Sequence, residues 1–154
     1  MTEDAAGIGS ASRAAAVREL EAEFGELISR FRRIVADNAD RLCPGLLPGA
    51  YKVFTTIARR EQVTLSALAE AILMDKGQLS RTVRELEKLN LVERTPDPTD
   101  GRSSLLSPTA FGLERLDAVR APQQGLLQRA IEDWSLDDVQ ALTRLLRALH
   151  NGVE

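Results

Sequence analysis

The stretch from residue 64 to residue 112 constrains the fold of this chain more than any other segment. Apolar residues recur at helical spacing up to Leu73, the run from Leu73 to Gly77 breaks the pattern, and a second amphipathic segment follows. A polar, turn-rich segment then separates two short strand-like runs. This order predicts a helix, a turn, a second helix and a hairpin. Such an arrangement supplies a helix for the major groove of DNA and a basic finger for a neighbouring groove.

The second predicted helix has one apolar and one cationic side. At about 100° per residue, Leu79, Val83 and Leu86 fall in one narrow sector, which is typical of a packed face. The opposite side has no side chain at Gly77, so a backbone can approach closely there. Arginine and glutamine match the edges of guanine and adenine. We therefore expect DNA contacts from Lys76, Gln78, Ser80, Arg81, Thr82, Arg84 and Lys88. The alternative is the solvated face of an ordinary amphipathic helix.

The predicted hairpin joins strands at residues 91–95 and 103–107 through a segment rich in turn-forming residues. Asp100 can accept hydrogen bonds from Arg102 and hold that guanidinium extended. An arginine held in this way suits the minor groove, where the negative potential is strong. We expect Arg94, Asp100 and Arg102 to contribute to DNA binding. The alternative is a surface hairpin with an incidental arginine.

These residues resemble the MarR family of bacterial winged-helix transcriptional regulators. The resemblance is detailed over residues 64–112 and looser over roughly 13–149. The matching residues are Leu68-Ala69, Asp75-Lys76-Gly77-Gln78-Leu79-Ser80-Arg81, Leu86-Glu87, Leu91-Val92-Glu93-Arg94, Asp97-Pro98, Asp100-Gly101-Arg102, Thr109 and Gly112. The resemblance implies a mainly α fold with a small β-hairpin wing, and a homodimer that binds a near-palindromic operator on double-stranded DNA. It also implies release from DNA by a small aromatic or phenolic ligand.

Several positions depart from the family pattern. Gly77 stands where serine or threonine is usual, which removes a possible hydroxyl contact. Asn90 replaces the usual glycine after the second helix, and asparagine tolerates the left-handed conformation that such a stop needs. Pro122 and Gly125 fall inside what the family makes a long helix, so we expect a break near Ala121.

The chain ends carry two further amphipathic regions, at residues 13–42 and 113–149. Ser135, with Asp138 three residues later, predicts the start of a last helix. Two long apolar faces are hard to bury within so small a chain, so we expect dimerisation helices, the alternative being an intramolecular bundle. The predicted organisation is a flexible tail at 1–12, a dimerisation helix and loop at 13–47, the winged helix-turn-helix at 48–112, and C-terminal dimerisation helices at 113–154. The apolar positions of the first region are Val17, Leu20, Phe24, Leu27, Ile28, Phe31, Ile34 and Val35.

A helix is also expected just before the DNA-reading segment. Pro48 suits its first turn, and Val53, Phe54 and Ile57 are core candidates. Phe31, Tyr51 and Phe54 are candidates for lining a ligand pocket, although a packed tyrosine is the simpler interpretation of Tyr51.

Few residues could support catalysis, metal binding or redox chemistry. Cys43 is the only cysteine and His150 the only histidine, so neither a histidine-rich metal site nor a Ser-His-Asp arrangement is plausible. We expect no enzyme activity, no metal and no cofactor. Cys43 leaves open a regulator that senses oxidants. With no intrachain disulfide, signal peptide or transmembrane run, a cytoplasmic protein without membrane contact is expected.

Charge limits how this chain could bind DNA. The net charge is −3, whereas residues 76–102 hold six basic and five acidic residues. Binding must therefore depend on where charges lie, with limited non-specific affinity. We expect a dimeric winged-helix regulator that represses transcription. A winged-helix module for protein contacts without DNA is the alternative, and it predicts an apolar recognition face.

Overall fold

The computed structural model describes residues 3–100 and 103–152. The chain divides into two compact units, Met1–Val119 and Arg120–Glu154. The first unit contains α1 to α5 and a small sheet, and the second contains a 3-10 turn, α6 and α7. Mainly helical structure with a small hairpin matches the predicted fold class.

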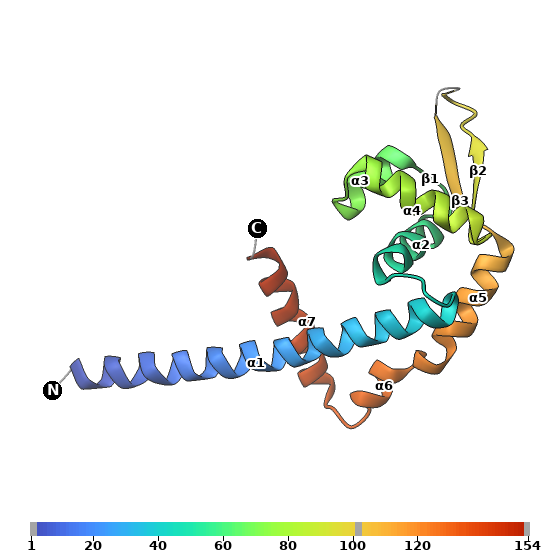
Figure 1. Cartoon of the computed structure of the whole chain (residues 1–154). Helices are drawn as coiled ribbons and strands as arrows, with labels where there is room; N and C mark the ends of the chain where they lie inside the picture. The colour runs from blue at the N-terminus through green and yellow to red at the C-terminus, as the bar shows by residue number, and fades with distance from the viewer. Residues whose placement is uncertain (1–2, 101–102, 153–154) are drawn as a thin grey trace. The chain divides into compact units, whose positions relative to one another are not determined.

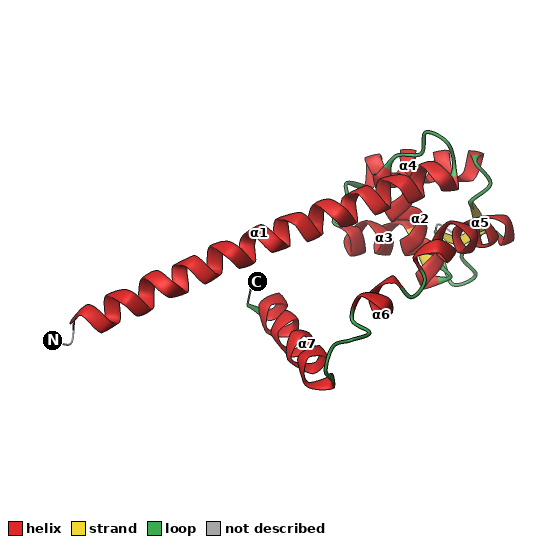
Figure 2. Ribbon diagram, turned by 90° about the horizontal axis from the view of Figure 1, so that it is seen from below, coloured by secondary structure: helices red, strands yellow, loops and turns green. Residues whose placement is uncertain are grey.

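The first helix is longer than the sequence led us to expect. α1 runs from Glu3 to Leu42 without interruption (Figure 2). The predicted flexible tail at residues 1–12 is therefore wrong for residues 3–12, which are helical. Alanine has the highest helix propensity, and no proline lies within residues 3–42, so no residue there is incompatible with a helix.

The next three helices along the chain are α2, α3 and α4 (Figure 1). α2 spans Pro48–Arg60, with proline in its first turn as predicted. α3 spans Leu65–Ile72, and the Thr64 side chain caps it by accepting a hydrogen bond from the amide of Ala67 at 3.2 Å. α4 spans Lys76–Lys88, and the Asp75 carboxylate caps it through the amide of Gln78.

The sheet has one more strand than predicted. β2 (Val92–Pro96) and β3 (Ser104–Pro108) form the expected antiparallel hairpin, which projects beyond the helices in Figure 1. β1 (Val63–Thr64) pairs with the other side of β3, so the order is β1-β3-β2. A two-residue strand has no alternating pattern to detect, so only tertiary pairing defines it.

One core unites the elements of the first unit. The apolar stripe of α4 is completely buried, as its spacing predicted, and each such side chain contributes roughly 1.5–3 kcal/mol by leaving water. The fully or almost fully buried residues with the largest side chains are Leu42, Val53, Phe54, Ile57, Leu68, Leu79, Val83, Leu86, Leu91 and Leu106.

Helix α5 (Ala110–Arg120) is hydrogen-bonded at two places, to the segment between α4 and β2 and to the end of α1. The Thr109 hydroxyl donates to the carbonyl of Asn90 at 2.6 Å and accepts from the amide of Gly112 at 2.9 Å. Arg115 donates to the carbonyls of Leu42 and Arg41, at 2.8 and 3.2 Å. These contacts join α5 to the rest of the first unit, whereas the predicted organisation groups residues 113–154 as C-terminal dimerisation helices.

The second unit begins at the predicted break. A 3-10 turn at Ala121–Gln123 contains Pro122, and Gly125 adopts a φ of 75° before α6 (Leu126–Ala130). The last helix, α7, spans Leu136–Asn151, and Ser135 caps it through the amide of Asp138. Within the described ranges, no helix combines the length and apolar character needed to cross a membrane.

Candidate nucleic-acid interface

The polar face of α4 is open to solvent. Lys76, Gln78, Arg81, Arg84 and Lys88 are exposed, whereas Leu79, Val83 and Leu86 anchor the opposite side. Burial of one face thereby fixes the rotation of the helix and keeps the cations pointing outward. Ser80 and Thr82 are half-buried at the flanks.

The N-terminal end of α4 carries the groups best suited to base edges. Gln78 and Arg81 have amide and guanidinium groups that form paired hydrogen bonds with adenine and guanine. The Thr82 hydroxyl donates to the carbonyl of Gln78 at 3.2 Å, so its oxygen remains an acceptor only. An added Cβ on Gly77 would lie 3.0 Å from the Asp75 carboxylate that caps the helix.

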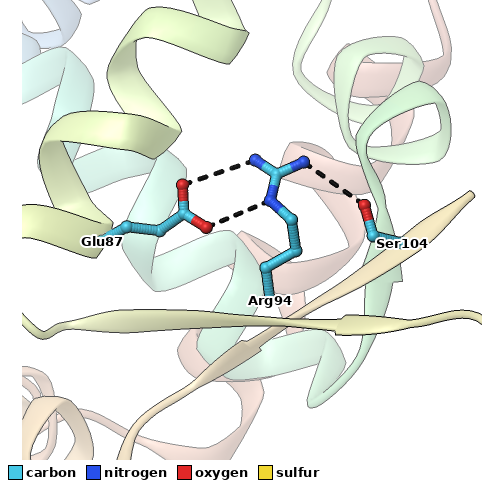
Figure 3. A network of polar contacts seen from close by, with 3 residues as sticks. All are labelled: Glu87, Arg94 and Ser104. Carbon is cyan, nitrogen blue, oxygen red and sulfur yellow. Dashed lines mark hydrogen bonds and ion pairs between the residues drawn. The ribbon is translucent and has the colours of Figure 1, made fainter.

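A salt bridge joins α4 to the hairpin. Arg94 on β2 donates from Nε to Glu87 Oε1 at 3.0 Å and from Nη2 to Glu87 Oε2 at 3.5 Å (Figure 3). Its Nη1 donates to the Ser104 hydroxyl on β3 at 3.3 Å. One guanidinium therefore links α4, β2 and β3, and it neutralises the Glu87 carboxylate beside the cationic face. We name these three residues the hairpin clamp.

The turn beyond the clamp is ordered by its own side chains. Asp97 accepts hydrogen bonds from the amide and the hydroxyl of Thr99, at 2.8 and 2.6 Å. These bonds favour the carboxylate and hold the pKa of Asp97 below its ordinary value. The bonds are therefore present at neutral pH, and they are lost only as the pH falls through that lowered pKa.

A sequence model described as the MarR family matches residues 45–103, which span α2 to the hairpin. The chain is 27% identical over 128 residues to the uncharacterized HTH-type transcriptional regulator YxaD of Bacillus subtilis, covering 82% of this chain and 90% of that protein. The chain belongs to the MarR family. It is thus a transcriptional regulator with a DNA-binding winged-helix fold, in a family of regulators and not of enzymes.

Two further proteins are similar to this MarR-family chain. The HTH-type transcriptional repressor IacR of Pseudomonas putida is 21% identical over 104 residues, covering 68% of this chain and 62% of IacR. The crystal structure of FabT from Streptococcus pneumoniae in complex with DNA superposes with a TM-score of 0.78. That alignment covers 89% of this chain and 96% of FabT at 14% identity, so the likeness is one of fold.

Two of the predictions for the hairpin concern Arg94 and the pairing of Asp100 with Arg102. Arg94 was expected to contact DNA, but its guanidinium is occupied by Glu87 and Ser104 in this structure. The predicted pairing of Asp100 with Arg102 lies outside the described residues, because Arg102 does; Asp100 itself is exposed. The sequence analysis did not identify Glu87 and Ser104 as partners of Arg94. The only sequence feature that could have indicated the ion pair is that Glu87 lies seven residues before Arg94.

The three predicted ligand-lining residues do not come together. Phe54 is fully buried and Tyr51 is 6% exposed, so both belong to the core. Phe31 is 60% exposed and lines an apolar groove along α1, formed with Phe24, Leu27, Ile28, Val35 and Pro48. Tyr51 is thus a packed tyrosine, which is the simpler of its two interpretations, and Phe54 is a core residue, while Phe31 lies on an accessible apolar surface.

The remaining chemistry-bearing residues form no cluster. Cys43 is half-buried in the turn after α1, where its amide donates to the carbonyl of Ala39 at 3.1 Å. In the part of the chain that the structure describes, no three histidine, cysteine or acidic side chains gather in a way that could hold a metal ion.

The hairpin clamp leads to a prediction for Glu87→Gln. We expect the change to reduce protection of the minor groove in a hydroxyl-radical footprint, because the hairpin loses its fixed angle to α4, while protection by α4 persists. The loss of unfolding free energy should be about 0.2–1 kcal/mol, since the pair is about one-third exposed. Tighter binding with a steeper salt dependence, by about one counterion, would instead identify the released Arg94 as a DNA contact.

Proposed function

We propose that this MarR-family regulator is a repressor that binds a near-palindromic operator as a homodimer and is released by a small, mainly apolar ligand. One observation supports DNA reading above all: α4 is completely buried on one face and presents Gln78, Arg81 and Arg84 on the other. The likeness to the repressor IacR and to FabT in complex with DNA supports the same proposal.

In the proposed complex, α4 enters the major groove. Arg81 and Gln78 contact base edges, while Arg84 and Lys88, farther along the helix, contact phosphates. The hairpin reaches the adjacent minor groove, where Arg102 is the proposed contact. Because the whole chain has a net charge of −3, we expect weak binding to unrelated DNA and a strong dependence on sequence.

The competing winged-helix function is a protein-interaction module that does not bind DNA. Such a module needs apolar side chains on the outward face of α4, and this face is charged and polar. Leu73, in the turn before α4, is 94% exposed, yet it is a single side chain. Scattered exposed apolar residues are ordinary on protein surfaces, so Leu73 alone does not favour the module.

The test is selection of bound fragments from a library of the source genome, followed by footprinting. We expect enrichment of near-palindromic sites whose half-site centres lie about 10 base pairs apart, one turn of DNA, as two-fold symmetric readers require. The protein used must be shown to be folded by its circular dichroism spectrum. If such protein enriches no sequence at moderate salt, the result contradicts the proposed function.

The proposed homodimer rests on apolar surface that each unit exposes. On α1, Leu20, Leu27 and Phe31 are 54%, 49% and 60% exposed. On α7, Leu145 and Leu149 are 61% and 48% exposed. Each row follows one helical face, and continuous apolar faces of this kind mark interaction sites.

Deletion of Ser135–Glu154 is expected to convert the dimer to monomer or aggregate. The deletion removes the apolar row of α7, so the apolar surface that this row covers in the proposed dimer is exposed to water. Sedimentation at micromolar concentration measures the change beside the intact chain. Intact protein that sediments as a monomer of 16.9 kDa would remove the dimer from the proposal.

The proposed release by a ligand also has an alternative, which is oxidation of Cys43. We expect Cys43→Ser to retain full operator binding and full ligand response, and peroxide to affect neither protein. A ligand that weakens DNA binding must, by linkage, bind the free protein more tightly than the DNA complex. If peroxide releases the unmodified chain from its operator and spares Cys43→Ser, the redox mechanism replaces the ligand mechanism.

A further inference from the structure

The last turn of α1 lacks two of its usual backbone hydrogen bonds. If the helix continued, the carbonyls of Arg41 and Leu42 would accept from the amides four residues later. Those amides donate elsewhere. The amide of Gly45 bonds the Asp40 carboxylate at 3.0 Å, and the amide of Leu46 bonds the carbonyl three residues before it at 2.9 Å. Because Leu42 is completely buried, its carbonyl needs another donor within the protein.

A single side chain of α5 supplies both missing donors. Arg115 donates from Nε to the carbonyl of Leu42 at 2.8 Å and from Nη2 to the carbonyl of Arg41 at 3.2 Å. Its Cζ atom also lies 5.7 Å from the centre of the Phe111 ring, one turn earlier on α5. A guanidinium can form two such bonds because its donors are held in one planar fork. Its positive charge suits the C-terminal end of a helix.

The same stretch of α5 is joined to the chain that follows α4. The Thr109 hydroxyl, just before α5, donates to the carbonyl of Asn90 at 2.6 Å. At Gly112 the helix lies so close to Leu91 that an added Cβ would be 2.6 Å from its carbonyl oxygen. Arg115 follows Gly112 by three residues, which is about one turn. The first half of α5 therefore connects the end of α4 to the end of α1.

The angle of α1 depends on this short connection. Among residues 12–42 of α1, only Asn38, Ala39 and Leu42 are buried, so the helix is packed within the chain through its C-terminal end. Leu27, on the exposed apolar row, lies about 22 Å along the helix from Leu42. A change of about 5° at the last turn would move Leu27 by about 2 Å, and the two α4 helices of a symmetric dimer by about 4 Å, roughly one base-pair step of DNA.

We propose that Arg115 is a positioning residue for operator binding. By bonding the end of α1, it fixes the angle between α1 and α5, and thereby the distance between the two α4 helices of a dimer. This distance determines which half-site spacing the protein accepts. The proposal rests on the DNA-binding homodimer proposed above, and it names the residue that sets the spacing. Arg115 acts without touching DNA, so its removal affects discrimination between spacings and not the contact of α4 with one half-site.

Spacing discrimination tests the proposal. The probes are the operator selected from the genomic library, the same duplex with one base pair inserted at its centre, and a duplex with a single half-site. Arg115→Met should reduce the ratio of the affinities for the first two duplexes about tenfold, because a looser connection lowers the effective concentration of the second α4 at its half-site. Affinity for the single half-site should not change.

Two further variants accompany Arg115→Met. Arg115→Lys keeps the positive charge but has no planar fork, so it should lose spacing discrimination in the same direction. It also replaces Arg115→Met if that variant does not fold. Arg120→Met is the matched control, because Arg120 lies exposed on the same helix. An unchanged affinity ratio would overturn the proposal. Equal losses on the operator and the single half-site would also overturn it, since they would show that Arg115 only stabilises the fold.

A measurement without DNA separates this proposal from the proposed function. Spin labels at Glu26→Cys on α1 and Glu85→Cys on α4, both exposed positions, report the distance between the two helices. The background is Cys43→Ser, and dilution with unlabelled chain restricts the signal to one protomer. We expect Arg115→Met to broaden the distance distribution.

The outcomes of the two measurements are distinct. An unchanged distance distribution in Arg115→Met would overturn the role of Arg115 even if the chain binds its operator. A broadened distribution in a chain that selects no operator would contradict the proposed function, and with it the role in half-site spacing. A broadened distribution together with lost spacing discrimination would support both proposals.

Discussion

Replacing Gly112 by alanine is expected to lower the free energy of unfolding by about 3 kcal/mol, near the upper end of the cost of overpacking. A Cβ at this position would lie 2.6 Å from the Leu91 carbonyl oxygen and 3.0 Å from Cζ of Phe54. The carbonyl belongs to the backbone, and it also accepts a hydrogen bond from the amide of Thr109, so it cannot move aside freely. Urea denaturation measures the change.

Gly49→Ala is the matched control for Gly112→Ala. Gly49 lies in the first turn of α2, and no atom lies within 4 Å of an added Cβ. Alanine there should leave stability unchanged or raise it slightly, because alanine has the higher helix propensity. Equal changes in unfolding free energy at Gly49 and Gly112 would contradict the close approach of α5 to Leu91, the residue before β2.

Arg81→Ala is expected to weaken operator binding by about 1–3 kcal/mol while leaving the melting temperature and the dimer unchanged. Arg81 is exposed, and no other described residue hydrogen-bonds or pairs with its guanidinium, so its removal disturbs no contact within the chain. Loss of discrimination at one base pair of the half-site would indicate a base contact. A uniform loss with a shallower salt dependence would indicate a phosphate contact.

Arg144→Ala controls for the loss of one positive charge. Arg144 lies on α7 and is exposed, so its removal changes the net charge equally without touching α4. We expect operator affinity close to that of the unmodified chain. If Arg81→Ala and Arg144→Ala weaken operator binding equally, the effect comes from long-range charge and not from direct contact between Arg81 and DNA. Arg81 would then no longer be assigned to the proposed site.

The sequence by itself determined the features that depend on neighbouring residues. The buried stripe of α4, the start of the last helix at Ser135, and the break near Ala121 were all predicted and are all observed. Asn90 adopts a φ of 57°, as its replacement of glycine required. Hydrophobic periodicity, capping and backbone conformation act over one or two turns, so the sequence displays them directly.

Only the tertiary structure decided features that depend on distant pairing. β1 exists because Val63 and Thr64 pair with β3, some forty residues later in the chain. Arg94 belongs to the hairpin clamp because α4 and β2 bring Glu87 within 3.0 Å. Phe54 faces the core and not a ligand pocket because α5 packs over it through Gly112. The sequence lists the groups that can pair, whereas packing determines which of them meet and which remain free for DNA.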